Sequence, residues 1–256
     1  MKILVLIKQV PDTWGDRHLD LSTGRADRAT DDQVIDEVGE RAVEAALVAK
    51  DTLGAEVIVA TMGPSGATDA LRKTLGMGAD SAIHLIDDAL AGSDLVRTAR
   101  MLHLLVEDCA PDLVICGNES TDGRGGMIPA MVAELAGWPH ATSLQSIEIE
   151  STAVRGIRAT DTGNAELACA LPAVVSVTEQ APEPRFPNFR GIMKAKKKPL
   201  RQITAGDLGG SGLLAGPVSV IVSAAERPPR TAGTKIVDEG NAGRELAEYL
   251  IGARLI

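Results

Sequence analysis

The residues best suited to bind a charged ligand lie in the stretch DLVICGNESTDGRGGMIPAMVAEL, residues 112–135. The apolar run 112–116 predicts a buried parallel strand, and the glycine-rich residues 117–126 predict a loop after it. From Met127 onward, apolar residues recur at helical spacing. A glycine loop that leads into a helix presents free N–H groups to a phosphate. Spacing alone leaves an ordinary strand-to-helix turn equally favoured, because no named phosphate motif is present.

Residues that could perform catalysis or hold a metal form no recognisable constellation. The histidines have no serine, cysteine or aspartate partner at triad-like spacing, and no metal-binding spacing occurs. The cysteines are too far apart for a metal motif, and we interpret them as buried free thiols in a reducing compartment. We therefore predict no metal site and no catalytic site. These residues are His18, His84, His103, His140, Cys109, Cys116 and Cys169.

Composition limits the kind of protein further. The chain has 256 residues, of which 45% are hydrophobic and only 2% aromatic. Its core must therefore consist of Val, Leu, Ile and Ala, as parallel α/β sheets prefer. A formal charge of −9 argues against nucleic-acid binding. Because no apolar run is long enough for a signal peptide or a membrane span, we expect a cytoplasmic chain without direct membrane insertion.

Strands and helices alternate over the first half of the chain. The pattern predicts strands at 2–7, 56–61, 81–86 and 112–116, with helices between them that Ser65 and Ser93 begin in two cases. Such alternation is typical of a Rossmann-like parallel sheet with right-handed crossovers. Ligands in such sheets bind at the carboxyl ends of the strands. Four segments should converge there: residues 6–10, the region of Asp36, residues 62–64 and residues 121–127.

The second half of the chain follows another pattern. The pattern predicts a small antiparallel extension made of residues 146–150, 153–159 and 166–170. It predicts a further strand at 173–178. The proline-rich residues 179–199 should be extended and exposed. Phe186 and Phe189 then form an interaction surface, unless both rings fold back onto the domain. We predict a nucleotide-binding domain at 1–178, followed at 179–256 by a contact loop, a last strand at 218–223 and a C-terminal arm.

The sequence RFPNFRGIMKAKKKP, residues 185–199, resembles the signature of electron transfer flavoprotein β subunits, the FixA-like family. Residues 2–10, 60–80, 112–139, 171–178 and 228–235 resemble further blocks of this family in the same order. The resemblance covers nearly the whole chain. It implies a non-catalytic electron carrier with a Rossmann-like, adenine nucleotide α-hydrolase-like fold.

The resemblance also implies cofactors and partners. The β subunit pairs with a larger α subunit that carries most of the FAD site. The heterodimer accepts electrons from acyl-CoA and related dehydrogenases, as in fatty acid oxidation, and passes them toward an ETF-quinone oxidoreductase-type acceptor. Many members hold a structural AMP in the β subunit, whereas electron-bifurcating relatives hold a second FAD there.

Site residues follow from the same resemblance. The family's docking loop corresponds to Arg185, Phe186, Phe189, Ile192 and Met193, with Phe189 as its anchor. Val10 and Thr13 are expected at the interface flavin. The chain departs from the family at Asp36-Glu37, where N-P is usual, and at Met127-Ile128-Pro129, where Q-[TV]-G is usual. The AMP contacts correspond to Leu6, Asp36, Met62, Thr121, Asp122, Gly123, Arg124, Gly125, Gly126, Met127 and Ile128.

Two other classes of protein remain as alternatives. An adenylating or ATP-pyrophosphatase enzyme would carry an S-G-G-x-D-S-like loop after the first strand, where this chain has Lys8-Gln9-Val10-Pro11-Asp12. A nucleotide-binding module of the universal-stress type would be shorter and would leave residues 179–256 without a purpose.

Overall fold

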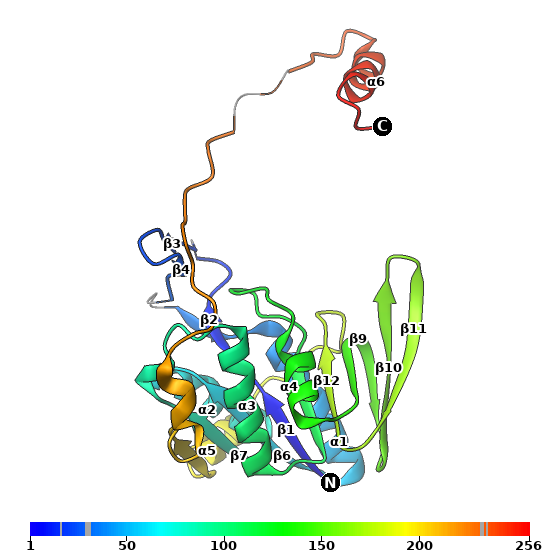
Figure 1. Ribbon diagram of the computed structural model, residues 1–256. Helices are drawn as coiled ribbons and strands as arrows, with labels where there is room; N and C mark the ends of the chain where they lie inside the picture. The colour runs from blue at the N-terminus through cyan, green and yellow to red at the C-terminus, as the bar shows by residue number, and fades with distance from the viewer. Residues whose placement is uncertain (16, 29–31, 231–232, 234) are drawn as a thin grey trace. The chain divides into compact units, whose positions relative to one another are not determined.

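A nine-stranded sheet organises the part of the chain described by the computed structural model, residues 1–15, 17–28, 32–230, 233 and 235–256 (Figure 1). Seven of these strands run parallel to one another, and the other two add an antiparallel extension at one edge. This arrangement confirms the predicted α/β fold class. The order is β11 (Gly163–Ala170), β10 (Ala153–Thr160), β9 (His140–Ile149), β12 (Ala173–Val177), β8 (Leu113–Gly117), β1 (Lys2–Leu6), β6 (Glu56–Met62), β7 (Ser81–Leu85) and β13 (Leu200–Ile203).

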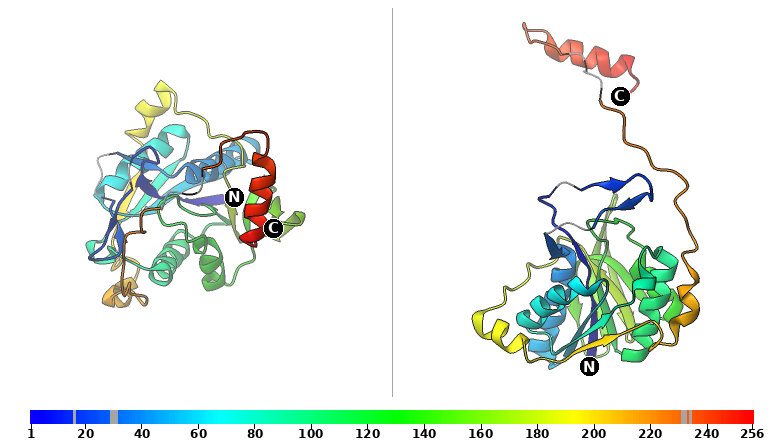
Figure 2. Two further views of the ribbon diagram at one scale, coloured as in Figure 1. Left: turned by 90° about the horizontal axis from the view of Figure 1, so that it is seen from above. Right: turned by 90° about the vertical axis from the view of Figure 1, so that its left-hand side faces the viewer.

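Helices cover both faces of the sheet (Figure 2). Because successive strand residues point to opposite faces, Ile3 and Val5 of β1 join one apolar cluster and Leu4 and Leu6 join the other. The first cluster includes residues of α1 (Glu37–Leu53) and α2 (Thr68–Met77). The second includes residues of α3 (Leu95–Cys109) and α4 (Ile128–Ala136). Burial on both faces explains why the strands read as continuous apolar runs.

The predicted starts of α2 and α3 are wrong by a few residues. Residues Ser65–Ala67 form a separate 3₁₀ turn, η1, and α2 begins at Thr68 without a side-chain cap. Asp94 rather than Ser93 caps α3, because its carboxylate accepts a hydrogen bond from the Arg97 N–H at 2.8 Å. The Ser93 hydroxyl is used elsewhere and donates to the Leu90 carbonyl at 2.6 Å, which closes the turn η2 (Asp88–Leu90).

The proline-rich residues 179–199 are only partly extended, in contrast to the prediction. Helix α5 (Phe189–Ala195) lies within them and packs against α2. Asn188 begins this helix by accepting a hydrogen bond from the Gly191 N–H at 2.8 Å. The following strand β13 was not predicted, because its four residues alternate only weakly between apolar and polar. It pairs in parallel with β7.

The strand predicted at 218–223 is also wrong. These residues do not pair with any strand in the described chain. The Ser219 N–H donates instead to the Asp94 carboxylate at 2.7 Å.

The chain divides into two compact units, Met1–Ser223 and Ala224–Ile256. The second unit contains α6 (Ala242–Gly252), in which no residue is buried. Of the family block at 228–235, Thr231, Ala232 and Thr234 lie outside the described residues. The helices in the described ranges are too short or too polar for any of them to cross a membrane.

Candidate functional site

The strand order reverses between β1 and β8, at the centre of the sheet. From β1 the chain adds β6 and then β7 on one side, and it crosses back to add β8 on the other. In parallel α/β sheets, ligands bind at the carboxyl ends of the strands at such a reversal. Leu6 ends β1 there and pairs with Ala60 of β6 and Cys116 of β8. The strand ends therefore meet as the sequence predicted.

The glycine loop, residues 117–126, follows β8 at this point and leads into α4. Gly117 lies so close to α1 that a Cβ atom there would be 3.2 Å from the Val38 Cβ. Gly126 has a left-handed backbone with φ +61°, which favours glycine. Among the described residues, the N–H groups of Gly125, Gly126 and Met127 donate to no protein acceptor. The loop therefore offers free donors at a helix N-terminus, and these suit a phosphate.

Asn118 adds an acceptor to the same loop. Its side-chain oxygen is buried, and within the described chain it receives no hydrogen bond. A buried polar atom without a partner is costly, so a ligand that donates to it would be favoured. The residues present thus fit a ligand that combines a phosphate with a hydrogen-bond donor.

Asp36 connects the glycine loop to helix α1. Its side chain is buried and caps α1 by accepting from the Val38 N–H at 3.2 Å. The other carboxylate oxygen accepts from the Thr121 N–H at 2.6 Å and from the Thr121 hydroxyl at 2.8 Å. Because these groups satisfy one another, neither side chain is free to bind a phosphate directly. Their geometry holds the loop in shape.

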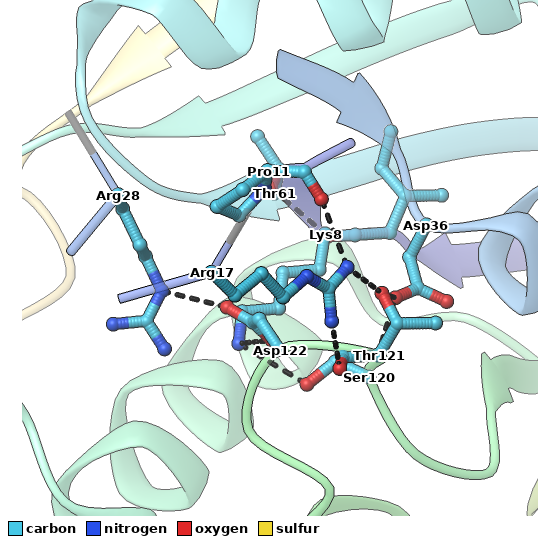
Figure 3. A network of polar contacts seen from close by, with 10 residues as sticks. Lys8, Pro11, Arg17, Arg28, Asp36, Thr61, Ser120, Thr121 and Asp122 are labelled. Atoms are coloured by element: carbon cyan, nitrogen blue, oxygen red, sulfur yellow. Dashed lines mark hydrogen bonds and ion pairs between the residues drawn. The ribbon is translucent and has the colours of Figure 1, made fainter. Parts of the chain in front are cut away.

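Asp122 is a second buried carboxylate at this site and belongs to the loop itself (Figure 3). Its side chain is 2% exposed and forms ion pairs with the Lys8 Nζ at 2.7 Å and the Arg28 Nε at 2.6 Å. Burial raises the pKa of Asp122, but the hydrogen bonds and charges of Lys8 and Arg28 outweigh it and hold the pKa well below its usual range. Lys8 also donates to the Ser120 hydroxyl at 3.2 Å.

Arg17 joins the glycine loop to the segment after β1. Its Nη2 donates to the Pro11 carbonyl at 2.9 Å and to the Thr121 hydroxyl at 3.1 Å, and its Nη1 donates to the Thr121 carbonyl (Figure 3). Sequence reasoning missed Lys8, Arg17 and Arg28 as site residues. The available signal was the presence of three cations near or within a long loop at the carboxyl end of β1.

The residues predicted at the flavin differ in exposure. Val10 lies in β2 (Gln9–Pro11), which pairs with β5 (Gln33–Ile35), and it is buried. Thr13 is exposed, and the neighbouring Trp14 is 96% exposed. In the sequence between β2 and β5, the strands β3 (Leu19–Asp20) and β4 (Arg25–Ala26) pair as a small hairpin.

The predicted docking residues lie on and before α5. Phe186 is 90% exposed and Phe189 is 78% exposed, so the two rings do not fold back onto the domain. Ile192 and Met193 are also exposed. Arg185 fixes the approach to the helix, because its Nη2 binds the Glu44 carboxylate at 2.9 Å and its Nη1 binds Asp51 at 2.9 Å. These hydrogen bonds and charges raise the Arg185 pKa above its usual value.

The remaining titratable candidates have structural partners. His84 is buried in β7, where its Nδ1 lies 3.1 Å from the Thr68 hydroxyl and its Nε2 lies 3.1 Å from the Gly63 carbonyl. The three cysteines are free and buried, as predicted, and burial raises the pKa of Cys116 to about 12. Among the described residues, no cluster of His, Cys, Asp and Glu is suited to hold a metal ion.

Comparison with known proteins decides the family. An electron transfer flavoprotein domain model matches residues 23–208. The electron transfer flavoprotein subunit beta of Mycobacterium leprae (strain TN) is 46% identical, with 99% of each chain covered. The chain belongs to the electron transfer flavoprotein β-subunit family. This confirms the resemblance and argues against the adenylating-enzyme and stress-module alternatives. Membership implies association with a flavin and pairing with an α subunit, in a family of electron carriers.

More distant relatives match over the same length. The electron transfer flavoprotein subunit beta of Thermoanaerobacterium thermosaccharolyticum is 34% identical over 100% of both chains. The caffeyl-CoA reductase-Etf complex subunit CarD of Acetobacterium woodii is also 34% identical, over 98% of this chain and 97% of CarD.

Proposed function

We propose that this β subunit carries electrons, within a heterodimeric flavoprotein, from acyl-CoA and related dehydrogenases to a quinone-linked acceptor. The observation that carries the proposal is the exposed apolar surface of α5. Aromatic residues are 2% of the chain, yet Phe186, before this helix, and Phe189, its first residue, are both exposed to solvent. Electron-transfer partners need a small contact that forms and breaks quickly, and one anchored helix suits that need.

The glycine loop is proposed to bind a structural AMP. The free N–H groups of Gly125, Gly126 and Met127 would hold the phosphate, and the buried Asn118 oxygen would accept a hydrogen bond from the nucleotide. Asp36 and Asp122 keep the loop in shape for this purpose. Leu6 and Met62 would supply apolar contacts from the strand ends.

The FAD is proposed to lie at the interface with the α subunit, against residues 10–13 of this chain. When bound, the flavin supplies the redox chemistry, and the protein orients it and limits its contact with water. Thr13 is exposed and available for that contact. Val10 is buried and would instead anchor the segment in the protein. A second FAD in place of AMP is the alternative, because FAD contains the same adenosine monophosphate group and would use the same loop.

Counting the bound cofactors tests both proposals. The chain is co-expressed with a candidate α subunit, and the purified complex is denatured to release its nucleotides. One FAD and one AMP per heterodimer is the expected result. Two FAD and no AMP would replace the AMP proposal with the second FAD. A chain that forms no heterodimer and holds no flavin would contradict the proposed function as a whole.

The docking proposal has its own test in Phe189→Ala. Truncating an anchor residue typically costs about 2 kcal/mol of binding, or roughly thirtyfold in affinity. The electron-transfer rate at low dehydrogenase concentration should fall accordingly, with unchanged FAD and AMP content. Leu135→Ala is the matched control, because Leu135 is also exposed but lies on α4, on the other face of the sheet. Equal rates in Phe189→Ala and the unaltered chain would refute the docking assignment.

A further inference from the structure

One guanidinium group connects the glycine loop with the segment proposed to face the flavin. Arg17 donates to the Pro11 carbonyl on one side and to the Thr121 hydroxyl and carbonyl on the other. Arginine has a rigid fork of donors and can therefore hold two backbone segments at a fixed separation. Pro11 and Thr121 are far apart in sequence, and in the structure they share this single side chain (Figure 3).

Two ion pairs strengthen the same connection. Both carboxylate oxygens of Asp122 are used, one by Lys8 at 2.7 Å and the other by Arg28 at 2.6 Å. Lys8 directly precedes residues 9–14, and Arg28 lies farther along the chain, before the return strand β5. Charge-assisted hydrogen bonds are stronger than neutral ones. The glycine loop therefore holds the chain between β1 and β5 firmly at Lys8 and at Arg28.

The segment 9–14 has few constraints at its outer end. The Trp14 side chain is 96% exposed. The Trp14 backbone N–H donates to the Asp12 carboxylate at 3.1 Å, which is a contact within the segment itself. The position of Trp14 and Thr13 therefore depends on how the segment is held further back. Pairing with β5 holds residues 9–11, and the Asp12 N–H donates to the Asp32 carbonyl at 3.0 Å. Further support comes from Lys8 and Arg17, on either side of the segment. Their partners Ser120, Thr121 and Asp122 belong to the same loop as the free N–H groups of Gly125 and Gly126.

We propose that Arg17 and the Lys8–Asp122–Arg28 ion pairs couple occupancy of the glycine loop to the position of Thr13 and Trp14, so that Arg17 is a positioning residue for the flavin. The proposal rests on the proposed AMP site and goes beyond it. A bound phosphate adds hydrogen bonds to residues 125–127 of the loop, and the stiffened loop restrains residues 12–14 more firmly through these side chains. The nucleotide then acts on the flavin site through this chain, without touching the flavin.

Tryptophan emission and hydrogen exchange can test the coupling. The chain has two tryptophans, Trp14 and Trp138, so Trp138→Phe leaves Trp14 as the only tryptophan of this subunit. The full chain is paired with an α subunit without tryptophan and stripped of nucleotide, and AMP is then added. We expect AMP to change the Trp14 emission and to slow amide exchange in residues 9–14 by about fivefold or more, the lower end of typical couplings between sites.

Variants separate the coupling from nucleotide binding. Arg17→Gln should bind AMP, as the released nucleotide shows, but the AMP-dependent change in exchange at residues 9–14 should disappear. Arg28→Gln, at a half-exposed position, should weaken the same change without unfolding the protein. Arg155→Gln is the control, because Arg155 is an arginine of similar exposure whose side chain forms an ion pair with Glu150 on the antiparallel extension, outside the glycine loop. It should keep the full response.

The flavin itself gives a further readout. Its midpoint potential, measured with and without AMP, should differ in the unaltered complex and should not differ in Arg17→Gln. A full response of residues 9–14 in Arg17→Gln would overturn the proposal. So would AMP binding to the unaltered complex without any change at these residues. If the nucleotide count shows that no AMP binds at all, the proposed AMP site is wrong, and the proposed coupling is then refuted as well.

Discussion

Asp36 and Asp122 each use both carboxylate oxygens within the protein. Asp36 connects the start of α1 with Thr121, and Asp122 connects Lys8 with Arg28. Donors of the protein therefore occupy both oxygens of each carboxylate. The departure from the family pattern at Asp36 is compatible with an anion in the glycine loop, because the N–H and O–H dipoles directed at Asp36 partly offset its charge.

Asp36→Ala should destabilise the chain by about 2–3 kcal/mol. The variant loses a helix cap and leaves the Thr121 N–H and hydroxyl without this acceptor in a partly buried place. Urea unfolding at neutral pH measures the change. Asp69→Ala is a suitable control, because Asp69 lies in the first turn of α2 but is exposed. A loss no larger than that of the control would show that Asp36 does not hold the loop.

Asp122 should make stability depend on pH in the acid range. Its folded pKa is below the usual aspartate value of about 3.9, so the stabilisation is present above that pH and is lost as pH falls through the folded pKa. The difference in unfolding free energy between the unaltered chain and Asp122→Asn should be constant from neutral pH down to about pH 5 and shrink below about pH 4. A difference independent of pH would contradict the ion pairs with Lys8 and Arg28.

Helix α5 is short, and its position depends on close contact with α2. A Cβ atom at Gly191 would lie 2.3 Å from the Gly76 carbonyl, so only glycine fits there without a shift of the helix. Arg72 donates to the carbonyls of Ala195 at 2.8 Å and Lys198 at 3.2 Å. These contacts are consistent with a docking surface that is already ordered before its partner arrives, which lowers the entropic cost of binding.

Gly191→Ala should displace α5 from α2 and slow electron acceptance, while FAD and AMP content stay the same. The expected loss in affinity for dehydrogenases is about tenfold, less than removal of the anchor itself. Gly243→Ala is the matched control, because a Cβ atom there meets nothing within 4 Å. Unchanged kinetics in Gly191→Ala would mean that the position of α5 does not matter for docking.

At the scale of the whole molecule, the aliphatic core and one exposed apolar surface belong to different units of the chain. The aliphatic core belongs to the unit Met1–Ser223. In the unit Ala224–Ile256, helix α6 exposes the large side chains of Leu246, Tyr249 and Ile251. Apolar side chains exposed in this way usually mark a surface that another protein covers.

A chain ended after Ser223 should keep its fold and lose its partner. Because no residue of α6 is buried, the thermal midpoint should change by less than about 4 °C, the shift that roughly 1 kcal/mol produces. Co-purification with the α subunit should fall strongly. A large drop in the midpoint would show that the C-terminal unit stabilises the sheet, and full co-purification would show that it does not contribute to pairing.

The sequence by itself determined the parallel core, the glycine loop and the family. These features depend on patterns within short segments, such as the apolar run 112–116 and the block at 185–199, and a segment carries such a pattern wherever it lies. Local pattern also predicted α4, whose observed start at Ile128 follows the expected one closely.

Only the tertiary structure decided which residues meet. Lys8, Arg17 and Arg28 are cations in or beside a long loop, and nothing in their spacing shows that they bind Thr121 and Asp122. Likewise, Leu200–Ile203 becomes a strand because it pairs with β7, whereas residues 218–223 have the stronger strand pattern but pair with no strand of the described chain. The physical reason is that long polar side chains and short strands take their structure from partners distant in sequence, and those partners exist only once the sheet has formed.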